Sequence, residues 1–197
     1  SAGIIQFKPF MHSRWNKDNS IPRGTGIIST NNKYDIRYQT TYDVRLYPFD
    51  IDSIHYERLS QDIIPLQCST HAEARLVIKF KKTIGFEHFT CDGLNLFIQN
   101  SKSLYATLLN DTICGIACNK IPFTAQAIGH EYPLSFWHEY GNRSSMYRLL
   151  NEYAILSEKF QFIRIVPDKN RLWKISEDVF ECVFYLNTYN DSIAQMK

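Results

Sequence analysis

Apolar and charged side chains alternate along residues 74–81, which read Ala-Arg-Leu-Val-Ile-Lys-Phe-Lys. A period of two places Leu76, Ile78 and Phe80 on one face of a strand and the basic residues between them on the other, as in a sheet with one face in water. Similar but less regular runs, separated by Asn, Asp, Gly and Pro, lie at residues 26–29, 34–41, 44–47, 54–59, 94–99, 160–165 and 179–186. The sequence therefore predicts a β-rich α+β fold with sandwich-like or curled, mostly antiparallel sheets and two short packing helices.

The first helix is expected just after residue 100. Ser101 and Ser103 are candidate N-caps, the apolar pairs at 104–105 and 108–109 fall on one helical face, and Asn-Asp at 110–111 closes the segment. A helix this short is marginal in water by itself, so we expect it to pack on a sheet.

The second helix is expected to begin near Ser144 or Ser145. Arg148 and Glu152 are four residues apart and are expected to pair on its exposed side. Its apolar stripe is expected to dock on a sheet and consists of Met146, Leu149, Leu150 and Tyr153.

The chain is then expected to turn at Ser157-Glu158 and to begin a strand at Lys159. In that strand Phe160 and Phe162 face one way. Packing, rather than chemistry, is the expected role of residues 146–162.

No tandem repeat, low-complexity tract or linker divides the sequence. We expect a single β-rich unit over residues 1–197, or two closely packed lobes with a boundary near 121–130. The sequence begins with Ser-Ala-Gly and enters a strand-like run at once, so we also expect it to be the middle part of a longer chain.

Composition excludes several classes of protein. With 22 basic and 20 acidic side chains the formal net charge is +2, well short of the positive balance that favours nucleic acid as a partner. The five cysteines are irregularly spaced, which favours a reducing compartment over a secreted disulfide framework. Because no apolar run approaches the roughly 20 residues of a membrane-spanning helix, we expect no direct insertion into a membrane.

No motif for catalysis, a cofactor or a metal is complete. Cys114 and Cys118 lack the usual Cys-x2-Cys spacing of a zinc site, and the His-Glu pairs at 130–131 and 138–139 lack the second histidine of a zinc-protease helix. Cys91 lies in a predicted turn before a strand, where a thiol nucleophile with a distant histidine is an alternative interpretation. The sequence favours a protein without catalytic, cofactor-binding or metal-binding residues.

Three aromatic residues around Pro133 form a possible interface: Tyr132, Phe136 and Trp137. Such a cluster fits a core, a protein interface or a platform that stacks on a sugar ring. A carbohydrate- or protein-binding β-sandwich module is therefore the alternative function.

Three stretches in a fixed order resemble a known family. The first is the predicted turn Pro22-Arg23-Gly24-Thr25, followed by Tyr-Gln-Thr-Thr-Tyr-Asp-Val at 38–44 and Leu-Tyr-Pro-Phe at 46–49. The second is Leu-Asn-Leu-Phe-Ile at 94–98 with the apolar pairs of the first helix. The third comprises Arg148, Glu152 and Tyr153 in the second helix and then Lys159, Phe160 and Phe162.

In order and spacing these stretches resemble the TssF family, a baseplate subunit of the bacterial type VI secretion system. Ser157 stands where the family usually has a proline, and a cysteine common in its first strand region is replaced around residues 34–38. The resemblance is that of a divergent member.

The resemblance implies a structural role in a baseplate wedge, without catalysis. It implies interaction with other baseplate subunits, especially a TssG-like protein, as well as possible self-association. It further implies a place in the cytoplasm at the inner face of the bacterial envelope.

Overall fold

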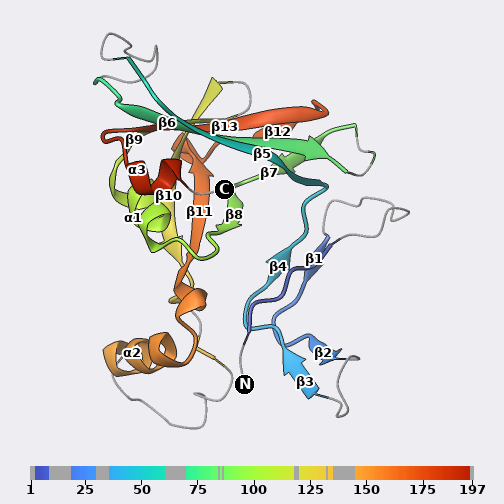
Figure 1. Cartoon of the computed structure of the whole chain (residues 1–197). Helices are drawn as coiled ribbons and strands as arrows, with labels where there is room; N and C mark the ends of the chain where they lie inside the picture. Colours follow the sequence, from blue (N-terminus) through green and yellow to red (C-terminus); the bar gives the residue numbers. More distant parts are fainter. Residues whose placement is uncertain are drawn as a thin grey trace. The chain divides into compact units, whose positions relative to one another are not determined.

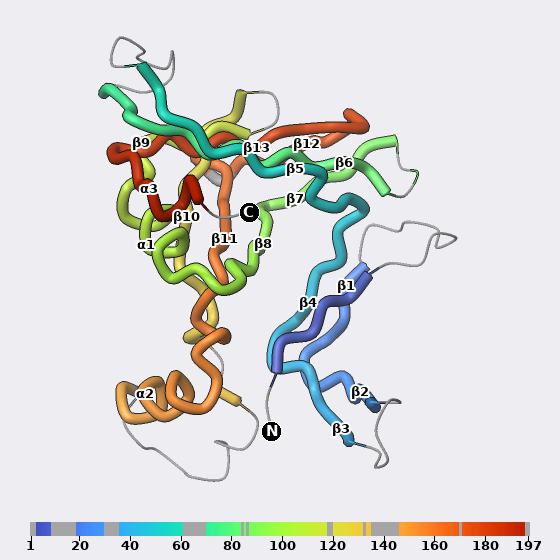
Figure 2. The backbone as a smooth tube through the Cα atoms, in the orientation of Figure 1, coloured from blue at the N-terminus to red at the C-terminus, as the bar shows by residue number. Residues whose placement is uncertain are grey.

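A computed structural model describes residues 3–8, 19–29, 36–60, 70–83, 85, 87–117, 120–131, 133–134 and 145–195 (Figure 1). The chain forms two compact units, each built from two separate stretches: unit 1 from Ser1–Tyr47 and Ile128–Phe160, and unit 2 from Pro48–Ala127 and Gln161–Lys197. Figure 2 follows the backbone through the three crossings between them. These crossings follow Tyr47, Ala127 and Phe160.

Unit 2 is built on one seven-stranded, curled sheet. In spatial order its strands are β5 (Phe49–Arg58), β6 (Ala74–Lys82), β13 (Val179–Leu186), β9 (Thr112–Ala117), β10 (Ile121–Ile128), β11 (Phe162–Pro167) and β8 (Leu94–Phe97). The neighbours β5–β6, β6–β13, β13–β9, β9–β10 and β11–β8 pair antiparallel. The predicted β-rich, mostly antiparallel fold is confirmed.

The core of unit 2 lies against one face of this sheet. Leu76, Ile78 and Phe80 on β6 are 2–4% exposed, which confirms the face predicted from their alternation. Phe180 pairs with Phe80 across the β6–β13 ladder, and the two rings stack with centroids 4.9 Å apart. Each buried side chain of this kind stabilises the fold by about 1.5–3 kcal/mol.

Shorter elements complete unit 2. The ribbon of β7 (Phe89–Cys91) and β12 (Trp173–Ile175) brings in Trp173, which is fully buried. Helix α1 (Lys102–Asn110) begins at the predicted cap, since Ser101 Oγ accepts a hydrogen bond from the Leu104 amide at 3.0 Å. The last elements are η4 (Asp168–Asn170) and α3 (Asp191–Ala194).

The described residues of unit 1 form two small ribbons, an α-helix and a short 3-10 helix. Its elements are β1 (Ser20–Ile21) paired with β4 (Val44–Arg45), β2 (Gly26–Ser29) paired with β3 (Ile36–Gln39), α2 (Ser145–Ile155) and η3 (Ser157–Phe160).

The predicted turn at residues 22–25 joins β1 to β2. Gly24 has a φ of +82°, which side-chain-bearing residues rarely adopt, and its amide donates to the Thr40 carbonyl at 2.8 Å. The Pro22 carbonyl accepts from the hydroxyls of Thr25 at 2.6 Å and Thr40 at 2.8 Å. Arg23 contributes its amide, which donates to Asp43 Oδ1 at 2.8 Å. The turn is therefore fastened to the segment between β3 and β4.

A glycine in the middle of β9 determines the packing at the centre of the sheet. Gly115 pairs with Phe123 on β10 and with Phe184 on β13, and those two rings meet edge to face with centroids 4.9 Å apart. A Cβ atom at position 115 would overlap the Phe123 ring. The Phe123 ring thus occupies the space that a side chain at position 115 would need.

We expect Gly115→Ala to lower the free energy of unfolding by about 1–3 kcal/mol, because the methyl group must displace a buried ring. Gly26→Ala on β2 is the control, since a Cβ there meets nothing within 4 Å. Chemical denaturation of both variants measures the difference. Equal losses in the two would contradict this account of the packing at Gly115.

Candidate interaction site on helix α2

Helix α2 turns its apolar side chains outward. Met146 is 72% exposed, Leu150 65% and Tyr153 46%, whereas Glu152 is fully buried. The expectation that this apolar stripe docks on a sheet while Glu152 lies on the exposed side was therefore wrong. Polar contacts help to hold the inner face of the helix, where Glu152 lies.

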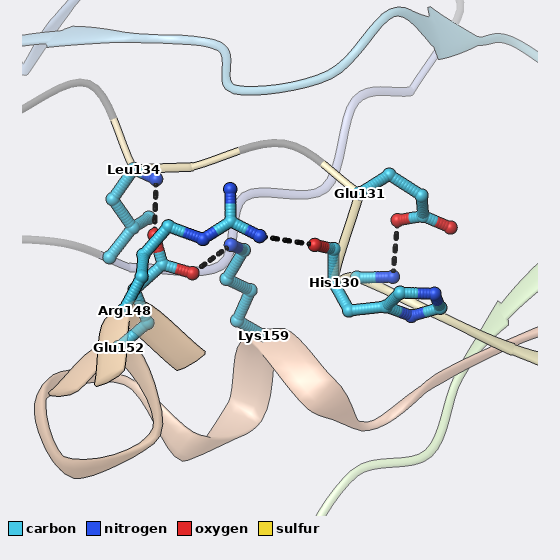
Figure 3. A network of polar contacts seen from close by, with 7 residues as sticks. His130, Glu131, Leu134, Arg148, Glu152 and Lys159 are labelled. Atoms are coloured by element: carbon cyan, nitrogen blue, oxygen red, sulfur yellow. Dashed lines mark hydrogen bonds and ion pairs between the residues drawn. The ribbon is translucent and has the colours of Figure 1, made fainter. Parts of the chain in front are cut away.

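A buried ion pair lies beneath the helix (Figure 3). Lys159 Nζ donates to Glu152 Oε2 at 2.6 Å, and the side chains are 3% and 0% exposed. Glu152 Oε1 accepts a hydrogen bond from the Leu134 amide at 2.8 Å. Both carboxylate oxygens therefore have a donor, as a buried charge requires.

The backbone between the two charges brings them together. The amide of Leu156 donates to the Glu152 carbonyl at 2.8 Å, and the amide of Lys159 donates to the Leu156 carbonyl at 3.2 Å. Lys159 thus belongs to η3, which folds back from the end of α2, and it does not begin a strand as expected. Its ammonium also lies 5.9 Å from the centroid of the Tyr42 ring, which belongs to the other stretch of unit 1.

Further contacts join the segment at 129–134 to α2 and η3. Arg148 donates from Nη2 to the His130 carbonyl at 2.8 Å, so it binds backbone rather than pairing with Glu152 (Figure 3). Glu131 Oε2 accepts from the Gly129 amide at 2.8 Å. Gly129 has a φ of +109°, and a Cβ atom there would overlap the Lys159 carbonyl oxygen. The close approach of these backbones therefore requires a glycine.

Burial has an electrostatic cost at this site. Loss of water lowers the pKa of Lys159, and the hydrogen bond to Glu152 opposes that shift. Buried pairs of this kind add little net stability compared with apolar residues, but removing one partner leaves an uncompensated charge. The pair therefore fixes which face of α2 points inward more than it stabilises the unit.

The outward face of α2 forms an uncharged apolar surface, called the α2 patch below. It consists of Met146, Tyr147, Leu150 and Tyr153, each 46–72% exposed. The spacing of Met146, Leu150 and Tyr153 places them on one side of the helix. Contiguous apolar surface of this kind marks an interaction site more often than it marks a solvated face.

The other sequence-predicted residues are not brought together. The Phe160 ring packs near Tyr153 with centroids 5.8 Å apart, whereas Phe162 begins β11 and packs on Phe97 at 4.8 Å. The two phenylalanines thus do not share one strand face. The proposed aromatic interface at Tyr132, Phe136 and Trp137 lies outside the described residues.

The described part of the chain also bears on the candidate thiol and on metal binding. Cys91 ends strand β7 with 1% of its side chain exposed, so the expected turn position of this thiol was wrong. Within the described residues no three His, Cys, Asp or Glu side chains converge as metal ligands would. No helix in these same ranges has the length and apolar character needed to span a membrane.

Comparisons with known proteins place this fold. The sequence model of a family described as "Type VI secretion system, TssF" matches residues 1–196. A chain in the "Structure of the type VI secretion system TssK-TssF-TssG baseplate subcomplex revealed by cryo-electron microscopy" has a similar fold, with a TM-score of 0.68 and 16% sequence identity. The match covers 92% of this chain and 35% of that chain, so this chain spans about a third of its length. No curated protein sequence matches this chain.

We expect Lys159→Met to lower the free energy of unfolding by about 3–5 kcal/mol, because it leaves the Glu152 carboxylate buried without its cation. Adding Glu152→Gln should recover part of this loss, since the amide oxygen still accepts from Leu134 and no charge remains. Lys81→Met, at an exposed position of β6, is the control and should change stability by less than about 0.5 kcal/mol. A double-mutant cycle by denaturation measures the coupling. Additive losses at Glu152 and Lys159 would contradict the buried pair.

Proposed function

Because this chain belongs to the TssF family of the type VI secretion system, we propose that it is a structural part of the secretion baseplate that binds other baseplate subunits and catalyses no reaction. A TssG-like protein is the first partner that we propose. The proposed location is the cytoplasm, at the inner face of the bacterial envelope.

The α2 patch is the observation that carries this proposal. Helix α2 buries Glu152, which pairs with Lys159 inside the unit. Its apolar residues Met146 and Leu150 are exposed on the surface. Such a face fits a hydrophobic groove on another protein, the usual partner of an amphipathic helix. The family match supports the same interpretation.

The other candidate functions have less support. A sugar-binding surface would rest on Tyr132, Phe136 and Trp137, none of which the structure describes. A thiol enzyme would need an accessible nucleophile, and Cys91 is 1% exposed in a paired strand. We therefore propose the baseplate role alone.

We expect Leu150→Glu in the full-length protein to weaken association with co-produced TssG-like and TssK-like subunits about tenfold or more, because a charge would enter an apolar contact. Leu172→Glu is the matched control, since Leu172 is 52% exposed, belongs to unit 2 and is not one of the α2 patch residues. Affinity chromatography with quantified subunit recovery measures association, and thermal unfolding confirms that both variants fold.

Equal recovery of partners by the two variants would exclude the α2 patch as the contact. If the unaltered protein recovered no baseplate subunit at all, the proposed function itself would be wrong.

A further inference from the structure

Strand β5 ends the seven-stranded sheet. It is ten residues long and pairs on one side with β6 along its whole length, while the spatial order places no strand of the described sheet on its other side (Figure 1). A long edge strand of this kind presents backbone amide and carbonyl groups that pair readily with another strand.

A β-bulge in β5 arranges its side chains. Ile51 pairs with Phe80 and Ile54 pairs with Ile78, so that Asp52 is the extra residue. Directly paired residues point to the same face of a sheet. The bulge therefore places Ile51 and Ile54, three residues apart, on the core-facing side of the sheet.

These two isoleucines lie between covered neighbours. Toward one end of β5, Phe49 is 7% exposed and packs edge to face on Phe180, with ring centroids 4.8 Å apart. Toward the other end, Tyr56 stacks on Tyr189 with centroids 5.3 Å apart. Ile51 and Ile54 between them remain 50% and 54% exposed, although their partners on β6 are buried. The core of unit 2 is thus uncovered at this part of β5.

The charges around this edge are unevenly matched. Glu57 forms an ion pair with Arg75, and the Arg58 guanidinium lies 4.8 Å from the centroid of the Tyr189 ring. Asp50 and Asp52 are exposed, and neither has an ion pair within the part of the chain that the structure describes. On β6, Lys81 is the register partner of Asp50 and Lys79 is that of Ser53, but no ion pair joins these lysines to Asp50 or Asp52 in the described residues. Both aspartates are exposed, so a basic side chain of a partner can also approach them.

Full-length pairing of β5 with β5 of a second copy is disfavoured. Antiparallel pairing of β5 with itself over its full length places Asp50 of one copy opposite Glu57 of the other. Like charges directly opposite each other destabilise a strand pair. The bulge and the charged residues of β5 also disfavour unspecific pairing with other strands. A strand that pairs with β5 must therefore carry charges that match it.

We propose that β5 accepts an extended strand of a different baseplate subunit, which continues the sheet of unit 2. The incoming strand pairs through its backbone, covers Ile51 and Ile54 with apolar side chains at alternate positions, and brings a basic side chain beside Asp50 or Asp52. The proposal rests on the proposed baseplate function and names a second contact, separate from the α2 patch.

Hydrogen exchange and photo-crosslinking test this contact in the full-length protein, with and without co-purified TssG-like and TssK-like subunits. In the complex, the exchange rate of the amides of residues 49–58 should fall by about tenfold or more, as it does in a paired strand. A photo-reactive amino acid at position 54 should crosslink to another subunit, at a segment with alternating apolar residues. The same group at position 28 on β2 is the control, since Ile28 is 57% exposed.

Substitutions at Ile54 and Asp50 test the apolar contact and the charge contact separately, with Ile28 as the control position. Ile54→Lys should weaken assembly about tenfold, whereas Ile28→Lys, an equally exposed isoleucine on a strand, should change it less than about twofold. Asp50→Lys should weaken it in a way that rising salt reduces. Thermal unfolding checks that each variant folds.

The outcomes distinguish the two proposals. Recovery of the complex with unchanged exchange in residues 49–58, or crosslinks from position 54 only to a second copy or to the same chain, would overturn the β5 contact and leave the baseplate function standing. Failure of the unaltered protein to form any complex would overturn both.

Discussion

The hydrogen-bonded charge of Glu152 determines how unit 1 can be arranged. A carboxylate that is fully buried needs donors on both oxygens, and Lys159 and the Leu134 amide supply them from two different segments. These contacts fix the rotation of α2 about its own axis, the turn of η3 back toward it and the approach of the segment at 129–134. The apolar residues of α2 are exposed because the opposite side of the helix carries Glu152, which must face inward to reach its donors.

In the described part of unit 2 the apolar side chains, and not a charge, are buried. The sequence therefore predicts unit 2 better than unit 1. In β6 the apolar residues Leu76, Ile78 and Phe80 alternate with their neighbours, so its buried face was assigned from the sequence alone. Strand β13 buries alternate residues in the same way, although its sequence is less regular. The first five residues of β5 were missed because the bulge at Asp52 shifts the phase of alternation. Strand β9 was missed because Gly115 weakens the pattern, and its role depends on a ring that another strand contributes.

The inner face of α2 could not be predicted by the same reasoning. Hydrophobic periodicity assigns apolar residues to the core and charges to water, and here both assignments are reversed. The partners of Glu152 lie seven residues ahead and eighteen behind, on segments whose positions depend on the tertiary fold. One local clue was present, since Lys159 follows Glu152 just beyond the helix end, within reach of a chain that turns back.

The two proposed contacts differ in what would make them specific. A helix face such as the α2 patch binds through buried apolar area, which tolerates small shifts of the partner and depends weakly on salt. An edge strand binds through backbone hydrogen bonds, and a shift of one residue would turn the apolar side chains of the partner away from Ile51 and Ile54. The bulge and the acidic residues of β5 further reduce the number of registers in which a partner strand can pair. A partner strand at β5 would therefore set the orientation of a neighbouring subunit, whereas the α2 patch would mainly add affinity.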